Sequence, residues 1–212
     1  MKVSIVDTRA SNQRSLENAL TRIGVAPTLA TNPDQLESAD VIFLPGVGAF
    51  GPAALSLRKT GMDAAIRRRC DEQGVPLVGI CLGMQLLATR SEENGSHQGL
   101  GLIEGTVKLL DPRESDNRVP NIGWCDVTAA RTGQLFDAGG DPEAFYFVHS
   151  YFFDVDSDQH IAATTDYGDT AIPVAVERDN IYGMQFHPEK SQDAGLDLLA
   201  RILGKIRETV LQ

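Results

Sequence analysis

Apolar, β-branched runs alternate with segments of helical periodicity over the first hundred residues. Three apolar runs predict buried strands: residues 3–6, 41–44 and 77–80. Between the first two, apolar side chains recur at the helical spacing i, i+3, i+4, i+7, at Leu16, Ala19, Leu20 and Ile23. Ser11 is placed to cap this helix, and Gly24 to end it. A further helix is expected around residues 64–66. This repeated strand–helix–strand pattern predicts a mostly parallel sheet covered by helices on both faces.

After residue 100 the pattern changes, because strand-like runs follow one another with few helical segments between them. These runs are residues 106–110, 145–148, 160–165, 174–177 and 181–185. They predict extra antiparallel strands in the C-terminal half. Residues 113–118 are polar and are expected to form a mobile loop. The chain closes with one more apolar helix face, formed by Leu196, Leu199, Ala200 and Leu203. Together the elements predict a single α/β domain over residues 1–212.

Composition narrows the functional classes. The formal net charge is −10, from 29 acidic and 19 basic residues, whereas nucleic-acid binding requires a basic face. The one basic run, residues 67–69, falls in a predicted helix and is interpreted as a solvated face. No apolar run approaches the ~18 residues that a membrane helix needs. Residues 1–7 predict a first strand and not a signal peptide, so we expect no membrane association and a cytoplasmic location.

The chain has three cysteines, and their spacing fits neither a disulfide framework nor a zinc site. Cys70 and Cys125 are interpreted as structural. Cys81 differs, because Gly79-Ile80-Cys81-Leu82-Gly83 lies between a predicted strand and a helical pattern over residues 84–87. This is the arrangement of a nucleophile elbow with cysteine in place of serine. The helix start favours a thiolate, and the backbone N–H of Leu82 would face an oxyanion. A buried structural cysteine is the alternative.

A candidate base follows the run at residues 181–185. In Phe186-His187-Pro188-Glu189, the proline disfavours helical geometry at His187. In an extended chain, residues i and i+2 point to the same side. We therefore expect Glu189 to reach one ring nitrogen of His187 while the other faces Cys81, as in a nucleophile–base–carboxylate triad. A surface histidine beside an acidic residue is the alternative.

A glycine-rich loop at residues 45–51 follows another predicted strand and lies before Pro52, a favourable first residue of a helix. Its three glycines match G-x-G-x-x-G, so a dinucleotide site is a rival interpretation. We disfavour it because the loop is not in the first strand-to-helix turn. Moreover Glu72, about 20 residues on, falls in a helix or loop. The preferred interpretation is a second oxyanion donor near Val47 and Gly48.

With these motifs, the chain resembles the class I, or triad-type, glutamine amidotransferases. The matching segments are PGVGAF at 45–50, GICLGMQLL at 79–87, YFVHSY at 146–151 and GMQFHPEKS at 183–191. Within that family, the likeness is greatest to the glutaminase subunits of imidazole glycerol phosphate synthase. The resemblance implies the amidotransferase-like fold, with a central, mostly parallel sheet. It also implies hydrolysis of glutamine to glutamate and ammonia, without a cofactor or metal.

The resemblance also implies residue roles. Cys81 attacks the amide carbon of glutamine and expels ammonia, which leaves a glutamyl thioester. His187 protonates the departing nitrogen and then activates water, while Glu189 orients His187. A further group matches positions that hold glutamine in relatives: Gly48, Gln85, Glu93, His149, Ser150 and Tyr151. Among them, Glu93 suits the ammonium group of the substrate.

A partner is implied as well, namely a (β/α)8 cyclase subunit. It would use the ammonia to make imidazole glycerol phosphate and aminoimidazole carboxamide ribonucleotide in histidine biosynthesis. Asn12, Trp124 and Lys190 lie where relatives contact this subunit. Two segments expected near it depart from the family pattern. Residues 8–12 lack the usual glycines, and Pro-His-x-Gly-Trp-Asn reads Pro-Asn-Ile-Gly-Trp-Cys at residues 120–125.

Three alternatives remain open from the sequence. The chain could be a glutaminase subunit for sugar or surface-polysaccharide amination. It could be a stand-alone cysteine γ-glutamyl hydrolase or peptidase on the same scaffold. It could also be a binding subunit without catalysis, although a complete Cys81–His187–Glu189 set argues against that reading.

Overall fold

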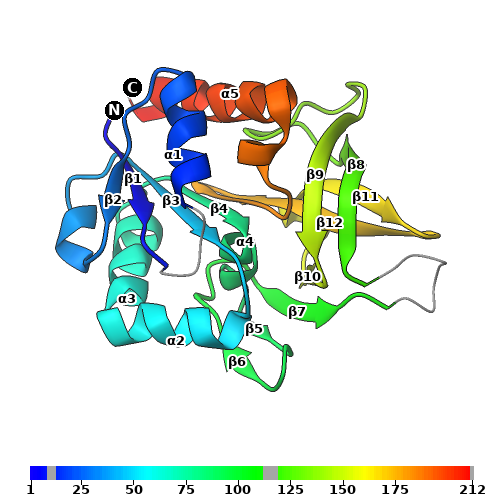
Figure 1. Cartoon of the computed structure of the whole chain (residues 1–212), viewed down its shortest axis with the longest axis horizontal. Coiled ribbons are helices and arrows are strands. Elements are labelled where there is room, and N and C mark those ends of the chain that lie inside the picture. The colour runs from blue at the N-terminus through cyan, green and yellow to red at the C-terminus, as the bar shows by residue number, and fades with distance from the viewer. Residues whose placement is uncertain (9–12, 112–118, 211–212) are drawn as a thin grey trace.

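Five parallel strands form one half of a nine-stranded sheet in the computed structural model, which describes residues 1–8, 13–111 and 119–210 (Figure 1). In sheet order they are β2 (Thr28–Ala30), β1 (Val3–Val6), β3 (Val41–Gly46), β4 (Leu77–Cys81) and β13 (Ile181–Met184). The predicted parallel sheet is therefore confirmed. The expectations for Ser11, Asn12 and residues 113–118 lie outside the described residues.

Antiparallel strands form the other half of this sheet. In order they are β12 (Thr170–Arg178), β11 (Ile161–Tyr167), β8 (Asn121–Ala129) and β9 (Glu143–His149). Strand β13 joins the two halves, since it runs antiparallel to β12 but parallel to β4. The prediction of an antiparallel strand at residues 181–185 is thus confirmed by its pairing with β12, and the parallel pairing with β4 is an addition that the pattern did not show. A second sheet contains β10 (Tyr151–Val155), β7 (Gly105–Leu109), β5 (Arg90–Ser91) and β6 (His97–Gln98).

Helices cover both faces of the parallel half (Figure 1). They are α1 (Gln13–Arg22) and α5 (Gln192–Val210) on one face, and α2 (Phe50–Thr60), α3 (Met62–Arg67) and α4 (Leu82–Leu86) on the other. Strand β3 shows why two apolar layers are needed. Val41 and Phe43 pack with α1 and α5, whereas Ile42 and Leu44 pack with α2 and α3. Successive strand residues point to opposite faces, so a strand buried on both sides is apolar throughout.

Several element boundaries differ from the sequence pattern. Strand β4 includes Cys81, and α4 begins at Leu82 and is only one turn and a half long. Strand β11 begins at Ile161, because residues 158–160 form a 3-10 turn. Helix α2 begins at Phe50, so Pro52 is its third residue and not its first. The predicted end of α1 is confirmed, with its last residue at Arg22 and Gly24 at a left-handed φ of 82°.

Strand β8 was missed by the apolar pattern although it has nine residues. Its largest apolar side chains, Ile122 and Trp124, are 59% and 49% exposed, whereas the smaller side chains of Cys125 and Val127 on the other face pack against the core. A strand of this kind lacks the continuous apolar run that marks a buried strand. The period-2 alternation of Ile122 and Trp124 with Gly123 and Cys125 was the available signal.

The fold brings three predicted motifs to one edge. Strands β3, β4 and β13 are neighbours, and Gly46 lies opposite Cys81 while Met184 lies opposite Ile80. Their carboxyl ends therefore meet, as expected for a ligand site in an open α/β sheet. No helix in the described part of the chain is long and apolar enough to cross a bilayer.

Candidate active site

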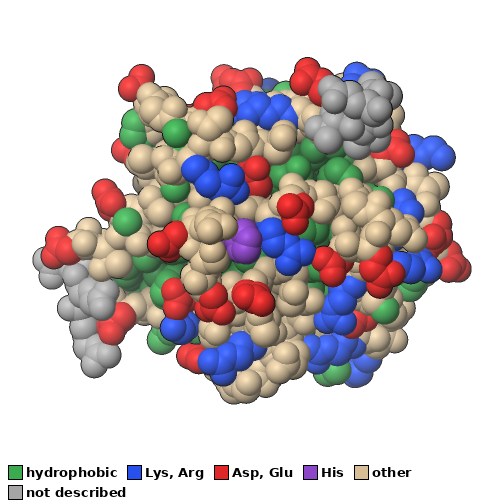
Figure 2. All heavy atoms as spheres, turned by 180° about the vertical axis from the view of Figure 1, so that it is seen from behind, with side chains coloured by type: hydrophobic (Ala, Val, Ile, Leu, Met, Phe, Trp, Pro, Cys, Tyr) green, Lys and Arg blue, Asp and Glu red, His purple; other side chains and the backbone are tan. Residues whose placement is uncertain are grey.

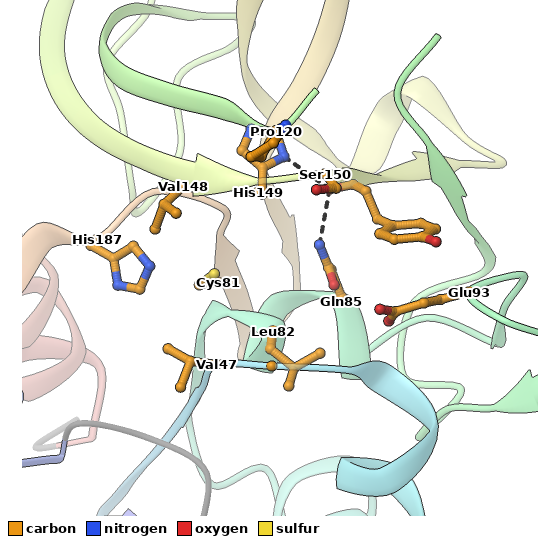
Figure 3. A pocket seen from close by; sticks show the side chains of 12 residues that line it. Val47, Cys81, Leu82, Gln85, Glu93, Pro120, Val148, His149, Ser150 and His187 are labelled. Carbon is orange, nitrogen blue, oxygen red and sulfur yellow. Dashed lines mark hydrogen bonds between the residues drawn. The ribbon is translucent and has the colours of Figure 1, made fainter. Parts of the chain in front are cut away.

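A cavity of about 450 Å³ opens beyond the carboxyl ends of β3 and β4 (Figure 3). Its volume is typical of a site for a small molecule. Ten of the residues singled out from the sequence line it: Val47, Gly48, Cys81, Leu82, Gln85, Glu93, His149, Ser150, Tyr151 and His187. Pro120 and Val148 complete the lining; both lie in segments compared with the family, but neither was predicted as a site residue.

Cys81 sits at a strained turn between β4 and α4. Its φ of 55° and ψ of −112° are unusual for a residue with a side chain, and such strain is typical of a nucleophile elbow. The turn also brings backbone segments very close together. A Cβ atom on Gly83 would lie 1.6 Å from the carbonyl oxygen of Leu44, and one on Gly79 would lie 2.7 Å from that of Gly83. Glycine is therefore required on both sides of the cysteine, as the motif predicted.

His187 and Glu189 form a buried pair beside Cys81. The carboxylate Oε1 of Glu189 lies 2.7 Å from Nδ1 of His187, and carboxylate oxygens only accept, so Nδ1 carries the proton. The other ring nitrogen, Nε2, is buried and has no hydrogen bond of normal geometry to a described group. The ring nevertheless lies close enough to Cys81 for the sulfur to affect its protonation (Figure 3).

The protonation of His187 follows from these neighbours. Burial alone lowers the pKa of His187, but interaction with Cys81 and Glu189, through hydrogen bonding and charge, outweighs burial and raises it from 6.5 to about 9. At neutral pH the ring is therefore an imidazolium. A protonated histidine next to a cysteine can stabilise a thiolate and can deliver a proton to a leaving group.

The predicted contact between His187 and Glu189 is confirmed, as is the extended geometry of His187, but the expectation that the extended chain continues to Glu189 is wrong. His187 is extended, with φ −104° and ψ 92°, whereas Pro188–Lys190 forms a 3-10 turn, η5, that brings the carboxylate back to the ring. Two hydrogen bonds join the ends of this segment to β9. The amide of His187 donates to the carbonyl of Tyr146, and the amide of Tyr146 donates to the hydroxyl of Ser191.

A row of polar groups lies on the opposite wall from His187. The amide nitrogen of Gln85 donates to the carbonyl oxygen of Tyr151 at 3.0 Å and to Oε1 of Gln185 at 2.9 Å. Both of its hydrogens are thus used, and only Oε1 of Gln85 is left for a substrate. Nδ1 of His149 lies 2.9 Å from the same carbonyl, so that nitrogen carries the proton.

His149 cannot serve as a cationic acid at neutral pH. Burial lowers its pKa to about 4, with a further lowering from His187, although the hydrogen bond to Tyr151 works in the other direction. Since Nδ1 donates, Nε2 accepts, and the side-chain amide of Asn121 donates to it at 3.2 Å. His149 is therefore a neutral positioning group, in agreement with its lack of an adjacent carboxylate in the sequence.

Glu93 lies at the far end of the cavity from His187 (Figure 3). Its Oε2 accepts a hydrogen bond of 2.7 Å from the amide of Phe50, the first residue of α2. This contact weakens the dinucleotide interpretation of residues 45–51. A bound pyrophosphate would need the N-terminus of that helix, and a carboxylate already occupies it. Among the described residues, no three His, Cys, Asp or Glu side chains are grouped so that they could hold a metal ion.

Two of the predicted partner-contact residues, Trp124 and Lys190, are exposed. Trp124 on β8 packs edge-on against Tyr146 on β9, with ring centroids 6.2 Å apart. Lys190 in η5 comes directly before Ser191, whose hydroxyl accepts a hydrogen bond from the amide of Tyr146. The third, Asn12, lies outside the described residues. On the back of the molecule, acidic side chains are scattered among the basic ones (Figure 2).

Comparison with known proteins identifies the family. The profile described as "Glutamine amidotransferase class-I" matches residues 4–203. Imidazole glycerol phosphate synthase subunit HisH 2 of Nitrobacter winogradskyi is 40% identical over 207 residues, which cover 95% of this chain and 97% of that protein. Subunit HisH of Zymomonas mobilis is 42% identical over 95% of this chain and 94% of its own length. That of Methanothermobacter thermautotrophicus is 41% identical over 97% and 99%.

Solved structures agree on the fold. The structure of PurLQS from Thermotoga maritima matches with a TM-score of 0.77 at 20% identity, over 97% of this chain and 98% of that one. A crystal structure described as a glutamine amidotransferase matches with a TM-score of 0.75 at 21% identity, over 97% and 100%. The fold and the family predicted from the four motifs are confirmed. The chain belongs to the class-I glutamine amidotransferase family.

Proposed function

We propose that this chain is the glutaminase subunit of imidazole glycerol phosphate synthase and that Cys81 is its nucleophile. The observation that carries the proposal is the meeting of a strained elbow cysteine with a hydrogen-bonded His187–Glu189 pair at one cavity. The relatives that match over more than nine-tenths of the chain, which are named as subunits of that synthase, support the choice of reaction.

Hydrolysis takes place in two halves. The thiolate of Cys81 attacks the amide carbon of glutamine, and the carbonyl oxygen becomes an oxyanion facing the backbone N–H groups of Leu82 and of Val47 or Gly48. His187 gives its proton to the amide nitrogen, ammonia leaves, and a thioester remains. Neutral His187 then takes a proton from water as the water attacks the thioester, and glutamate and the Cys81 thiolate are released.

The cavity has polar groups suited to the rest of the glutamine molecule. Glu93 faces the substrate ammonium from the end opposite His187, and Oε1 of Gln85 accepts from the substrate. Gly48, His149 and the Ser150–Tyr151 segment complete the walls. Gly48 has a φ of 94°, which a residue with a side chain adopts only under strain, so the loop needs glycine there.

The partner in this proposal is a (β/α)8 cyclase subunit, which receives the ammonia and makes imidazole glycerol phosphate and aminoimidazole carboxamide ribonucleotide. The exposed Trp124 and Ile122 on β8, together with Lys190, support a docking surface beside the triad. The resemblance assigns Asn12 to the same partner contact. The proposal includes a single domain over residues 1–212, because one sheet carries both apolar layers, and a cytoplasmic location.

Co-expression with the cyclase from the same organism tests the proposal. We expect the two chains to purify as a heterodimer that forms imidazole glycerol phosphate from glutamine, and the isolated chain to be a slow glutaminase that the cyclase and its ligand activate. If the isolated chain hydrolyses glutamine at its full rate and does not bind the cyclase, it is a stand-alone hydrolase. If ammonia is passed to a sugar acceptor instead, the partner has been assigned wrongly.

The pH dependence of this reaction tests the role of Glu189. In the wild type we expect kcat/KM to fall as pH rises through about 9, because deprotonated His187 can no longer protonate the leaving nitrogen. The carboxylate favours the imidazolium, so the Glu189→Gln variant lowers the pKa of His187 and moves this limb to lower pH. The expected loss of kcat is about 100-fold or more.

Glu143→Gln is the matched control. That carboxylate pairs with Arg201 on the surface, far from His187 in the chain and outside the cavity lining. The pH dependence of kcat/KM for this variant should match that of the wild type. An unchanged alkaline limb in Glu189→Gln would show that the carboxylate does not act on His187.

A further inference from the structure

Gln185 is a buried polar residue that the mechanism above leaves without a role. It is the first residue after β13, its side chain is 0% exposed, and its backbone amide donates to the carbonyl of Val174 at 2.8 Å. Its side-chain nitrogen lies 3.6 Å from Sγ of Cys81, a normal distance for an N–H···S hydrogen bond. A fully buried amide next to a nucleophile needs a reason, since burying it without partners is costly.

The orientation of this amide follows from the groups behind it. The carbonyl oxygen of Tyr151 can only accept, so the atom of Gln85 that faces it must be the nitrogen. That same nitrogen faces Gln185, so the atom of Gln185 that faces Gln85 must be its oxygen. The nitrogen of Gln185 is then directed at the sulfur of Cys81. The hydrogen-bond network therefore determines which terminal atom of Gln185 is the nitrogen and which is the oxygen. The shape of the amide alone does not distinguish them.

We propose that Gln185 is a positioning residue that holds the Cys81 thiolate by donating Nε2–H to Sγ, and that Gln85 and the carbonyl of Tyr151 fix its direction. The inference rests on the proposed function, since it assigns a role in the glutaminase reaction. His187 approaches the thiolate from the cavity, and Gln185 approaches it from the protein interior. The sulfur thus lies beside the His187 ring and accepts a hydrogen bond from the Gln185 amide.

Hydrogen bonds to a charged partner are stronger than neutral ones, so removing this donor should have a measurable cost. For Gln185→Leu in the complex we expect kcat to fall about tenfold. KM should change by less than about twofold, because the side chain is fully buried and reaches no substrate. The rate of Cys81 alkylation by iodoacetamide at neutral pH should fall by a factor similar to that for kcat. Gln185→Glu keeps the shape but directs an acceptor at the sulfur, so both rates should fall further.

Thr165→Val is the matched control for the loss of a buried hydrogen bond. Thr165 is 3% exposed and its hydroxyl donates to the carbonyl of Asp126 at 2.7 Å, outside the cavity lining. This variant should lose stability but keep the wild-type kcat and alkylation rate. If Gln185→Leu keeps both rates, or if its only change is a raised KM, the proposal is overturned.

A measurement on the wild type covers the case in which the Gln185 variants do not fold. With glutamine side chains labelled with 15N, one amide resonance should shift when Cys81 is alkylated, and the same resonance should be displaced in Cys81→Ala. No shifted glutamine resonance would overturn the proposal. Alkylation and resonance shifts do not require turnover, so they test Gln185 even if the chain proves to have no glutaminase activity.

Discussion

Replacing Cys81 with alanine abolishes the release of ammonia from glutamine, while the complex still forms imidazole glycerol phosphate from free ammonium. The variant removes the sulfur that attacks the amide carbon in the proposed reaction, and it changes no other residue that lines the cavity. We expect glutaminase turnover to fall by at least about 10⁴-fold, as for loss of a nucleophile in other triads. Product formation with saturating ammonium should stay near the wild-type rate.

Cys70→Ala is the control for this prediction. Burial raises the pKa of the Cys70 thiol to about 12, so Cys70 is a neutral thiol at the pH of the assay. It lies in the apolar layer with α3 and takes no part in the cavity. Its loss should lower stability slightly and leave ammonia release unchanged. Glutaminase activity that survives in Cys81→Ala and disappears in Cys70→Ala would contradict the assignment of the nucleophile.

Gly83→Ala is expected to have the largest effect on stability. The added Cβ would lie 1.6 Å from the carbonyl oxygen of Leu44, which belongs to the backbone of the central strand β3 and cannot move away as a side chain can. We expect the free energy of unfolding, measured by urea denaturation, to fall by more than about 3 kcal/mol, or the protein to accumulate in an insoluble form.

Gly204→Ala is the control, because the same glycine-to-alanine substitution is expected to raise the free energy of unfolding there. Gly204 lies inside α5, and a Cβ there would meet no atom within 4 Å. Alanine in a helix interior is favoured over glycine by about 0.5–1 kcal/mol, so this variant should be slightly more stable than the wild type. If the two variants had similar stability, the close approach at the elbow would not be a real constraint.

The sequence was sufficient for the central part of the site, because its signals there are local and strong. Continuous apolar runs marked β3 and β4, which are buried on both faces, and glycine marked the turns that follow them. Cys81 and His187 could then be paired without coordinates, because the carboxyl ends of parallel strands share one edge. The family resemblance supplied the more distant residues, such as Glu93.

Other parts of the structure depend on contacts that no local pattern reports. The two-residue strands β5 and β6 are too short to show a period. The turn at Glu189 was misjudged because Pro188 constrains the residue before it but also suits the start of a 3-10 turn. No role was predicted for Gln185, because its partner Cys81 is 104 residues away in the sequence.

Strand β13 has a consequence for how the enzyme is made. It is synthesised late, yet it lies in the middle of the sheet between β4 and β12. During translation, β4 and Cys81 are made before β13 and His187. Until β13 is available, one edge of β4 has no partner strand. Pairing over such a separation is slow, and exposed edges favour aggregation. A partly synthesised chain therefore carries Cys81 without His187, and glutamine hydrolysis can begin only after β13 has been inserted into the sheet.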